Sequence, residues 1–162
     1  MFESFLIRRK SLNVPTRCRL LLAILSNSEL LETLLDGADL ITPNKKEAEN
    51  ILSCSLKSDE DFENACLKIC RSFNIKACLI TRGSDGMSYI SKKIKCHVKS
   101  EAREIFDVSG AGDTVIAAFV ASTLIGLDPK VATDFSNRAA GIVVGHVGTT
   151  PITDFELENY SL

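Results

Sequence analysis

The sequence predicts an α/β layered fold with a partly parallel sheet, on three observations. Residues 62–73 carry apolar side chains at helical spacing, and the short apolar run 77–81 that follows is typical of a buried strand. Residues 93–99 alternate apolar and polar side chains, as a strand with one solvated face does. Residues 112–125 are apolar almost all round, which indicates a buried helix.

The elements at the start of this order have recognisable boundaries. Ser26 and Glu29 have capping-box spacing ahead of an apolar stripe, and Gly37 suits the end of that helix. Residues 38–42 then predict a short buried strand, which Pro43 ends.

Two helices are expected next. The first, at residues 45–52, is short, and the capping-box pair Ser58 and Asp61 opens the second. Cys66 and Cys70 lie on the apolar face of that second helix, so we expect core residues there rather than a metal or redox pair.

The remaining elements are two strands and a second pair of helices. Antiparallel strands are expected at 87–91 and 93–99, and the alternation in the second strand puts His97 on its solvated face, away from catalysis. After the apolar helix, Asp128 and the proline that follows it begin a last helix, which we expect to run to residue 145.

Composition excludes several classes of protein. A chain of 162 residues with 45% hydrophobic and 25% charged residues is typical of one globular domain. Its net charge of −2 gives no attraction to nucleic acid or to an anionic membrane. No apolar run approaches the ~20 residues of a membrane helix. The six cysteines lack C-x-x-C spacing, which favours free thiols in a reducing, cytoplasmic compartment over a zinc site. Residues 1–25 are basic without periodicity and receive no assignment.

The strongest chemical signal lies at residues 107–113, directly before the apolar helix. Gly110, Ala111 and Gly112 are small enough for the backbone to approach a ligand, and amides at the positive end of a helix bind anions such as phosphate. Asp113 beside them could accept a proton from an attacking hydroxyl group. A plain glycine-rich turn with an acidic first helical turn explains the same residues, and the pattern is not a Walker loop.

Two more turns follow predicted strands, where ligands bind in open α/β sheets. Residues 81–86 form a glycine turn that a simple hairpin also explains. Asn44 and Glu47 could hold a hydrated Mg²⁺ near phosphates or form a capping box, and both interpretations can hold at once. Asn137 stands among small residues that leave room for a flat ring or for a neighbouring helix. Together these features indicate a cleft that handles phosphates.

Several of these segments resemble known motifs. Residues 107–120, DVSGAGDTVIAAFV, resemble the second signature of the ribokinase-like (PfkB) carbohydrate kinases. Residues 44–47 are similar to that family's N-x-x-E motif, and residues 81–86 to its T-x-G-x-x-G turn. More narrowly, LITPNKKEAE, LITRGSDGMSY and SNRAAGIVVGHVGT are similar to the kinase domain of the heptose kinase/ADP-heptose synthase group. The resemblance covers residues 34–157.

This resemblance implies a fold and an activity. Residues 26–162 would be the C-terminal, nucleotide-binding half of a ribokinase-like kinase, with helices on both faces of its sheet. The activity would be ATP-dependent phosphorylation of a sugar hydroxyl, of the D-glycero-D-manno-heptose 7-phosphate 1-kinase type in ADP-heptose and lipopolysaccharide synthesis. The alternatives are a non-catalytic nucleotide-binding fragment, and a kinase of the same family for another sugar or a nucleoside.

The resemblance also implies roles for single residues. Gly110, Ala111 and Gly112 would form the anion hole for the transferred phosphoryl group, with Asp113 as the base on the sugar hydroxyl. The other implied contacts are Asn44 and Glu47 with Mg²⁺, Thr81, Gly83 and Gly86 with the ATP phosphates, Asn137 and Gly148 with adenine and ribose, and Asp107 and Ser109 with a monovalent cation such as K⁺.

The chain also departs from the family. Intact members have a first half that supplies most of the sugar site, the lid and the homodimer contact, and that half is not recognisable here. His146 stands where the heptose group usually has lysine. We therefore expect this chain to be the nucleotide-binding half of a kinase, as in a truncated gene product.

Overall fold

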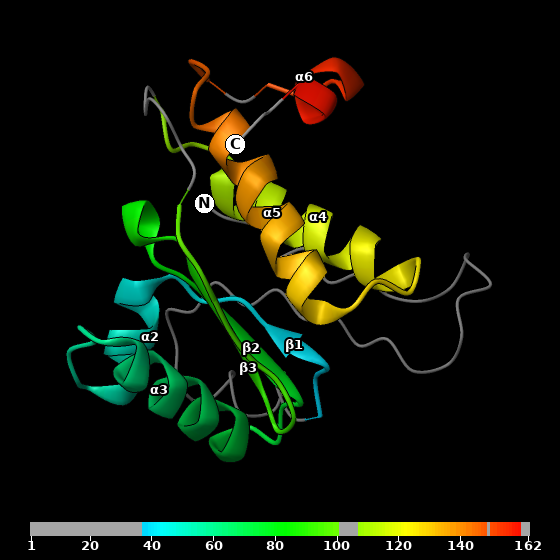
Figure 1. The fold of residues 1–162 in the computed structure, drawn as a ribbon. Helices are drawn as coiled ribbons and strands as arrows, with labels where there is room; N and C mark the ends of the chain where they lie inside the picture. Colours follow the sequence, from blue (N-terminus) through cyan, green and yellow to red (C-terminus); the bar gives the residue numbers. More distant parts are fainter. Residues whose placement is uncertain (1–36, 101–106, 149, 160–162) are drawn as a thin grey trace. The chain divides into compact units, whose positions relative to one another are not determined.

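The computed structural model describes residues 37–100, 107–148 and 150–159 (Figure 1). The helix expected from Ser26 and the unassigned segment 1–25 lie outside the described residues. The elements, in chain order, are β1 (Leu40–Ile41), α2 (Lys45–Leu52), α3 (Asp59–Ser72), β2 (Ala77–Thr81), the 3₁₀ turn η1 (Gly83–Asp85), β3 (Met87–Ser91), β4 (Lys95–Val98), α4 (Ala111–Leu124), α5 (Pro129–Val143) and α6 (Asp154–Asn159).

The four strands form one sheet in the order β1-β2-β3-β4. β1 pairs with β2 in parallel, with Leu40 opposite Ala77 and Ile41 opposite Cys78. The connections from β2 to β3 and from β3 to β4 are too short for a crossover, so these neighbouring strands run antiparallel. The predicted α/β fold with a partly parallel sheet is confirmed.

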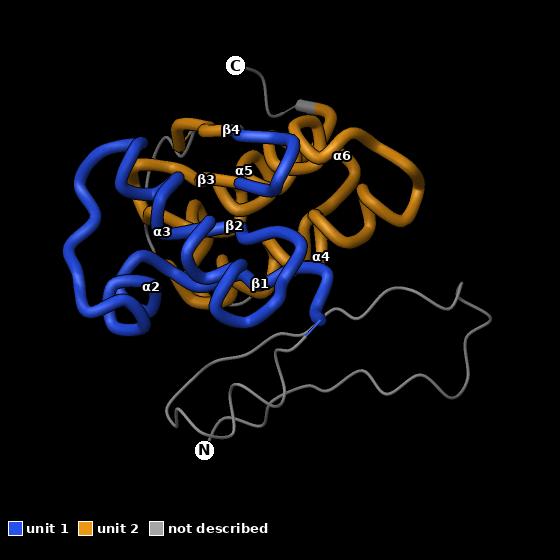
Figure 2. Tube along the Cα trace, turned by 90° about the horizontal axis from the view of Figure 1, so that it is seen from below, with its two compact units in different colours: residues 1–80, 90–95 blue, residues 81–89, 96–162 orange. Residues whose placement is uncertain are grey.

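The chain divides into two compact units, residues 1–80 with 90–95 and residues 81–89 with 96–162 (Figure 2). In the first unit, α3 buries one face, which includes Phe62, Cys66 and Ile69. This face belongs to a core that also holds Ile41 and Ile80 from the strands. The predicted core position of Cys66 is confirmed, and Cys70 packs half-buried at the edge of the same cluster.

Both helices of the first unit begin as their capping residues predict. Ser58 Oγ accepts a hydrogen bond from the Asp61 amide at 3.2 Å, and Asp61 Oδ2 accepts one from the Ser58 amide at 2.8 Å. Backbone hydrogen bonds from Ser58 and Lys57 lower the pKa of the Asp61 carboxyl. Such reciprocal bonds satisfy amides that a helix leaves without partners in its first turn.

In the second unit, α4 and α5 pack side by side (Figure 1). The Asp128 side chain caps α5 by accepting a hydrogen bond from the Lys130 amide at 2.8 Å, with Pro129 at the first helical position, as predicted. Tyr89 of β3 stacks on Phe119 of α4, with ring centroids 5.4 Å apart. This contact joins the strand to the helix that follows residues 107–110.

Two expectations about burial are wrong. Only Val115, Phe119 and Ser122 of α4 are buried, and Leu124, which we expected inside, is 58% exposed. An all-apolar sequence predicts how much apolar surface a helix carries, but not how many neighbours it meets. His97 is half-buried instead of solvated, because its ring meets a buried serine of the next strand.

The described part of the chain contains no helix long and apolar enough to cross a membrane. Within the same residues, no group of three or more histidine, cysteine, aspartate or glutamate side chains is placed to hold a metal ion.

Candidate functional site

Residues 107–113, which lead into α4 and include its first turn, are here called the anion loop. Gly110 caps the helix with φ +79° and ψ −6°, a left-handed conformation that glycine adopts readily. The Ala111 amide donates to the Val108 carbonyl at 3.3 Å. Among the described residues, the amides of Gly110, Gly112 and Asp113 have no hydrogen-bond partner. The loop therefore offers three donors at the positive end of a helix.

The loop is open at its surface. Gly112 and Asp113 are exposed, and a Cβ atom built on Gly112 would meet no other atom within 4 Å. The carboxylate of Asp113 thus lies in the first turn of α4 beside the unpartnered amides and is accessible to a substrate.

Asp107 ties the anion loop to the segment after α5. Its Oδ1 accepts a hydrogen bond from the Ser109 amide at 2.9 Å, and its Oδ2 accepts one from the Gly148 amide at 3.1 Å. The Ser109 hydroxyl and amide, together with the Gly148 amide, lower the pKa of the Asp107 carboxyl. The structure therefore brings together three predicted site residues, with a structural role for Asp107.

Residues 81–86, here called the glycine turn, join β2 to β3 as a hairpin. The Arg82 amide donates to the Gly86 carbonyl at 2.8 Å, and the Asp85 amide donates to the Arg82 carbonyl at 3.3 Å. Gly86 has φ +93°, and a Cβ atom there would lie 2.0 Å from the Val98 carbonyl oxygen. The hairpin interpretation is thus correct, and Gly86 must be glycine because the end of β4 passes directly over it.

Asn137 reaches the same end of β4 from α5. It is 4% exposed, and its Nδ2 donates to the Lys99 carbonyl at 2.7 Å. The structure thus gives Asn137 a packing role, and its contact with adenine or ribose stays a prediction.

Asn44 and Glu47 lie in the other unit, at the start of α2. Asn44 Oδ1 accepts from the Glu47 amide at 2.9 Å, and Glu47 Oε2 accepts from the Asn44 amide at 2.8 Å. The capping-box interpretation of this pair is confirmed, and the Mg²⁺ contact remains a prediction.

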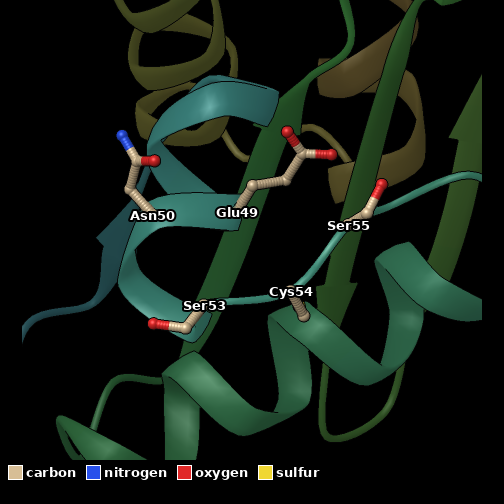
Figure 3. A pocket seen from close by; sticks show the side chains of 5 residues that line it. All are labelled: Glu49, Asn50, Ser53, Cys54 and Ser55. Carbon is tan, nitrogen blue, oxygen red and sulfur yellow. The ribbon is translucent and has the colours of Figure 1, made fainter.

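A hollow of about 480 Å³ lies in the first unit, at the end of α2 (Figure 3). None of the residues that line it was predicted as a site residue. Glu49 in its wall is held by the Leu56 amide, which donates to Oε1 at 2.8 Å. The hollow is a feature of the turn after α2, and its lining is Glu49, Asn50, Ser53, Cys54 and Ser55.

Behind the glycine turn lie Ser88, which sequence reasoning missed, and His97, which it placed on a solvated face. Ser88 is fully buried, its Oγ accepts a hydrogen bond from Arg82 Nη1 at 3.1 Å, and it lies 2.9 Å from His97 Nδ1. A serine in the otherwise apolar run after Gly86 is the only local signal that could have indicated this arrangement.

Comparison with known proteins agrees with this arrangement of motifs. The bifunctional protein HldE of Vibrio parahaemolyticus is 39% identical over 122 residues, which are 75% of this chain and 25% of that protein. HldE of Escherichia coli strain SMS-3-5 is 39% identical over 124 residues, 76% of this chain and 26% of that protein. The chain thus spans about a quarter of the length of these curated relatives.

Solved structures show the same fold. Ribokinase from Thermotoga maritima is 26% identical with a TM-score of 0.68, over 80% of this chain and 44% of that one. Arabidopsis thaliana ribokinase, complexed with ribose and ATP, is 26% identical with a TM-score of 0.67, over 73% and 38%. Phosphofructokinase-2 from Escherichia coli, in complex with potassium, shares the fold with a TM-score of 0.73 at 19% identity, over 82% and 44%.

The family model described as pfkB family carbohydrate kinase matches residues 6–155, and this match begins inside the segment 1–25 that the sequence left unassigned. Because the match spans nearly the whole chain, and the fold and relatives agree with it, the chain belongs to the pfkB family of carbohydrate kinases.

Proposed function

We propose that the chain carries the phosphate-handling part of an ATP-dependent phosphotransferase that acts on a sugar hydroxyl. The proposed acceptor is the anomeric hydroxyl of a heptose 7-phosphate, because segments of the chain resemble the heptose kinase group and the HldE proteins share 39% identity with it. We further propose that the reaction takes place in the cytoplasm and serves ADP-heptose and lipopolysaccharide synthesis.

The observation that carries this proposal is the anion loop. Three amides without partners among the described residues point to a bound anion, and the exposed Asp113 carboxylate lies in the same helical turn. The loop is exposed, and its glycines are not followed by the lysine of a Walker loop. Fixed donors aimed at the place where charge develops stabilise a transition state, so the loop suits a migrating phosphoryl group.

The proposed step is an in-line displacement. The sugar oxygen attacks the γ-phosphorus of ATP, the bond from that phosphorus to the β–γ bridging oxygen breaks, and ADP leaves. The hydroxyl proton passes to Asp113, while the amides of Gly110, Gly112 and Asp113 donate to the oxygens of the phosphoryl group. Positioning of the two substrates supplies most of the acceleration.

The residues implied for cations are compatible with them. Glu47 uses Oε2 in the capping box, which leaves Oε1 for a hydrated Mg²⁺. Bound Mg²⁺ would neutralise charge on the ATP phosphates. The two Asp107 oxygens accept the Ser109 and Gly148 amides and the Ser109 hydroxyl, which leaves about one of the four lone-pair sites of the carboxylate for a monovalent cation.

The test has two stages. Calorimetry of the 162-residue chain with Mg·ATP measures nucleotide binding, and an ADP-release assay with heptose 7-phosphate then measures transfer. We expect binding in the first stage, and heat signals equal to those of buffer alone would contradict the proposal.

A second candidate is a nucleotide-binding chain that transfers nothing by itself. The observation that favours it is the coverage, because the matched curated relatives are about four times as long as the matched part of this chain. Nucleotide binding without sugar-dependent ADP release would support this candidate over the first.

A further inference from the structure

Three side chains behind the glycine turn form a hydrogen-bonded relay. Arg82 Nη1 donates to Ser88 Oγ at 3.1 Å, and Ser88 Oγ lies 2.9 Å from His97 Nδ1. Arg82 follows β2, Ser88 lies in β3 and His97 lies in β4, so the relay crosses three neighbouring strands. The turn bond from the Ser91 amide to the Ile94 carbonyl sets the register that puts Ser88 opposite His97.

The chemistry of the three groups fixes the direction of these bonds. A guanidinium group only donates, so Ser88 Oγ accepts from Arg82. Ser88 is 0% exposed, and its only other partner among the described residues is His97 Nδ1. The buried hydroxyl therefore donates its hydrogen to His97 Nδ1, since otherwise that hydrogen would have no acceptor. The neutral imidazole then carries its own proton on Nε2.

The relay ends on the residue that closes the glycine turn. Arg82 makes two of the three backbone hydrogen bonds of the turn, to the Gly86 carbonyl and from the Asp85 amide, and the third runs from the Gly86 amide to the Gly83 carbonyl at 3.1 Å. Anchoring its side chain to β3 and β4 therefore restricts the backbone of the whole turn. The end of β4 also lies directly over Gly86, where a Cβ atom would be only 2.0 Å from the Val98 carbonyl oxygen.

We propose that Ser88 and His97 are positioning residues, which hold Arg82 and through it the glycine turn in the conformation that receives the nucleotide phosphates. This role rests on the proposed function. Neither residue touches the nucleotide, and both act through the backbone of the turn. Their side chains select this conformation because Ser88 Oγ can bond to Arg82 Nη1 and His97 Nδ1 at once only when the three strands keep their present register.

The first test is spectroscopic and needs no nucleotide. In ¹⁵N-labelled chain at a pH of about 8, where histidine is mostly neutral, we expect the ring nitrogens of His97 to show the Nε2–H tautomer. His146→Gln identifies the signals of the other histidine. Ser88→Ala should shift the Nδ1 signal toward that of a neutral imidazole without a donor partner, and Ser88→Thr, which keeps the hydroxyl, should keep the wild-type signal. An Nδ1–H tautomer at His97, or no response to Ser88→Ala, would overturn the relay.

The second test measures the affinity for Mg·ATP. Ser88→Ala should weaken it about tenfold, as expected for losing the hydrogen bond to the charged Arg82, and His97→Leu should weaken it less, because it removes only the acceptor of the Ser88 hydroxyl. Ser88→Thr and His97→Asn should restore it, because the Asn carbonyl oxygen can accept where Nδ1 did. Ser72→Ala, which removes an exposed hydroxyl at the end of α3 and outside the sheet, is the control and should bind as wild type. Circular dichroism checks that each variant folds.

The outcomes separate the two proposals. If wild-type chain does not bind Mg·ATP, the proposed function fails together with the nucleotide role, and the tautomer still decides whether the relay exists. If wild-type chain binds and Ser88→Ala binds equally well, the positioning role is overturned while the proposed function stands.

Discussion

At the scale of single residues, Asp113 carries the sharpest chemical prediction. Its carboxylate is exposed beside amides that are free of partners in the described part of the chain, so removing its charge should leave phosphate binding intact. We expect Asp113→Asn to bind Mg·ATP as wild type while lowering sugar-dependent ADP release by about 10²- to 10⁴-fold, the usual contribution of a general base. Asp134→Asn, an exposed aspartate of α5, is the control and should not change turnover. Equal turnover by Asp113→Asn would remove Asp113 from this role.

Gly86 and Gly83 form a matched pair in one turn. Both have positive φ, but a Cβ atom at Gly86 would strike backbone atoms of residues 98–100, whereas one at Gly83 would meet nothing within 4 Å. Gly83→Ala should lower the free energy of unfolding by about 1 kcal/mol, because alanine is strained at a positive φ although its Cβ atom meets no clash. Gly86→Ala should lower it by about 3 kcal/mol or more, because backbone cannot move aside as a side chain can. Urea unfolding of both variants measures the difference, and equal losses would contradict this account.

At the scale of elements, local signals predicted boundaries well. The helix at Lys45–Leu52 and the strands Ala77–Thr81 and Met87–Ser91 have the predicted bounds, because caps and glycine turns act within a few residues. The strand expected at 38–42 shrinks to Leu40–Ile41, since only these residues pair with β2. Which residues pair across strands depends on segments far apart in the sequence, so local signals do not predict it.

The same distinction divides the predictions about the site. The anion loop and the glycine turn are contiguous in sequence, so their glycines and acidic residues could be identified there. The bonds from Asn137 to Lys99 and from Gly148 to Asp107 join residues 38 and 41 positions apart, which no spacing rule reaches. His97 was misplaced for this reason, because its position depends on a serine of the neighbouring strand.

The start of α3 provides a prediction about one element. Ser58 Oγ satisfies the Asp61 amide, and its loss would leave that donor without a partner in the first turn. We expect Ser58→Ala to lower the free energy of unfolding by about 1 kcal/mol. Ser72→Ala, at the exposed last position of the same helix, should stay within about 0.5 kcal/mol of wild type. Thermal or urea unfolding measures both, and a Ser58→Ala loss no larger than the Ser72→Ala change would refute the cap.

At the scale of the whole molecule, the two units carry different parts of the family's motifs. The anion loop, the glycine turn, Asn137 and Gly148 all fall in the second unit, and the Asn44–Glu47 pair falls in the first. Apart from the bonds between Asn44 and Glu47, the contacts that join predicted site residues to one another lie within the second unit. The Mg·ATP experiments on the variants of the glycine turn and the anion loop test that unit directly.

The thiols provide a readout of the fold as a whole. Alkylation requires an accessible thiolate, and of the described cysteines only Cys54 is exposed. Burial raises the pKa of the Cys70 thiol to about 12. Burial also raises the pKa of the Cys78 thiol well above its usual value, and the hydrogen bond and charge of Cys66 raise it further. Cys66 is fully buried in the same core.

We therefore expect iodoacetamide at a pH of about 8 to modify Cys54 quickly in folded chain and to reach Cys66 and Cys78 only as the chain unfolds. Cys18 lies outside the described residues, so the experiment uses Cys18→Ser as background, with mass spectrometry to assign each modified cysteine. Cys54→Ser on that background should remove the fast phase. Adding urea should bring the buried thiols into reaction at the same concentration at which circular dichroism reports loss of structure, because Cys66 and Cys78 belong to the core that joins α3 to the strands. Alkylation of Cys66 or Cys78 at the rate of Cys54 in native buffer would contradict the packing of this core.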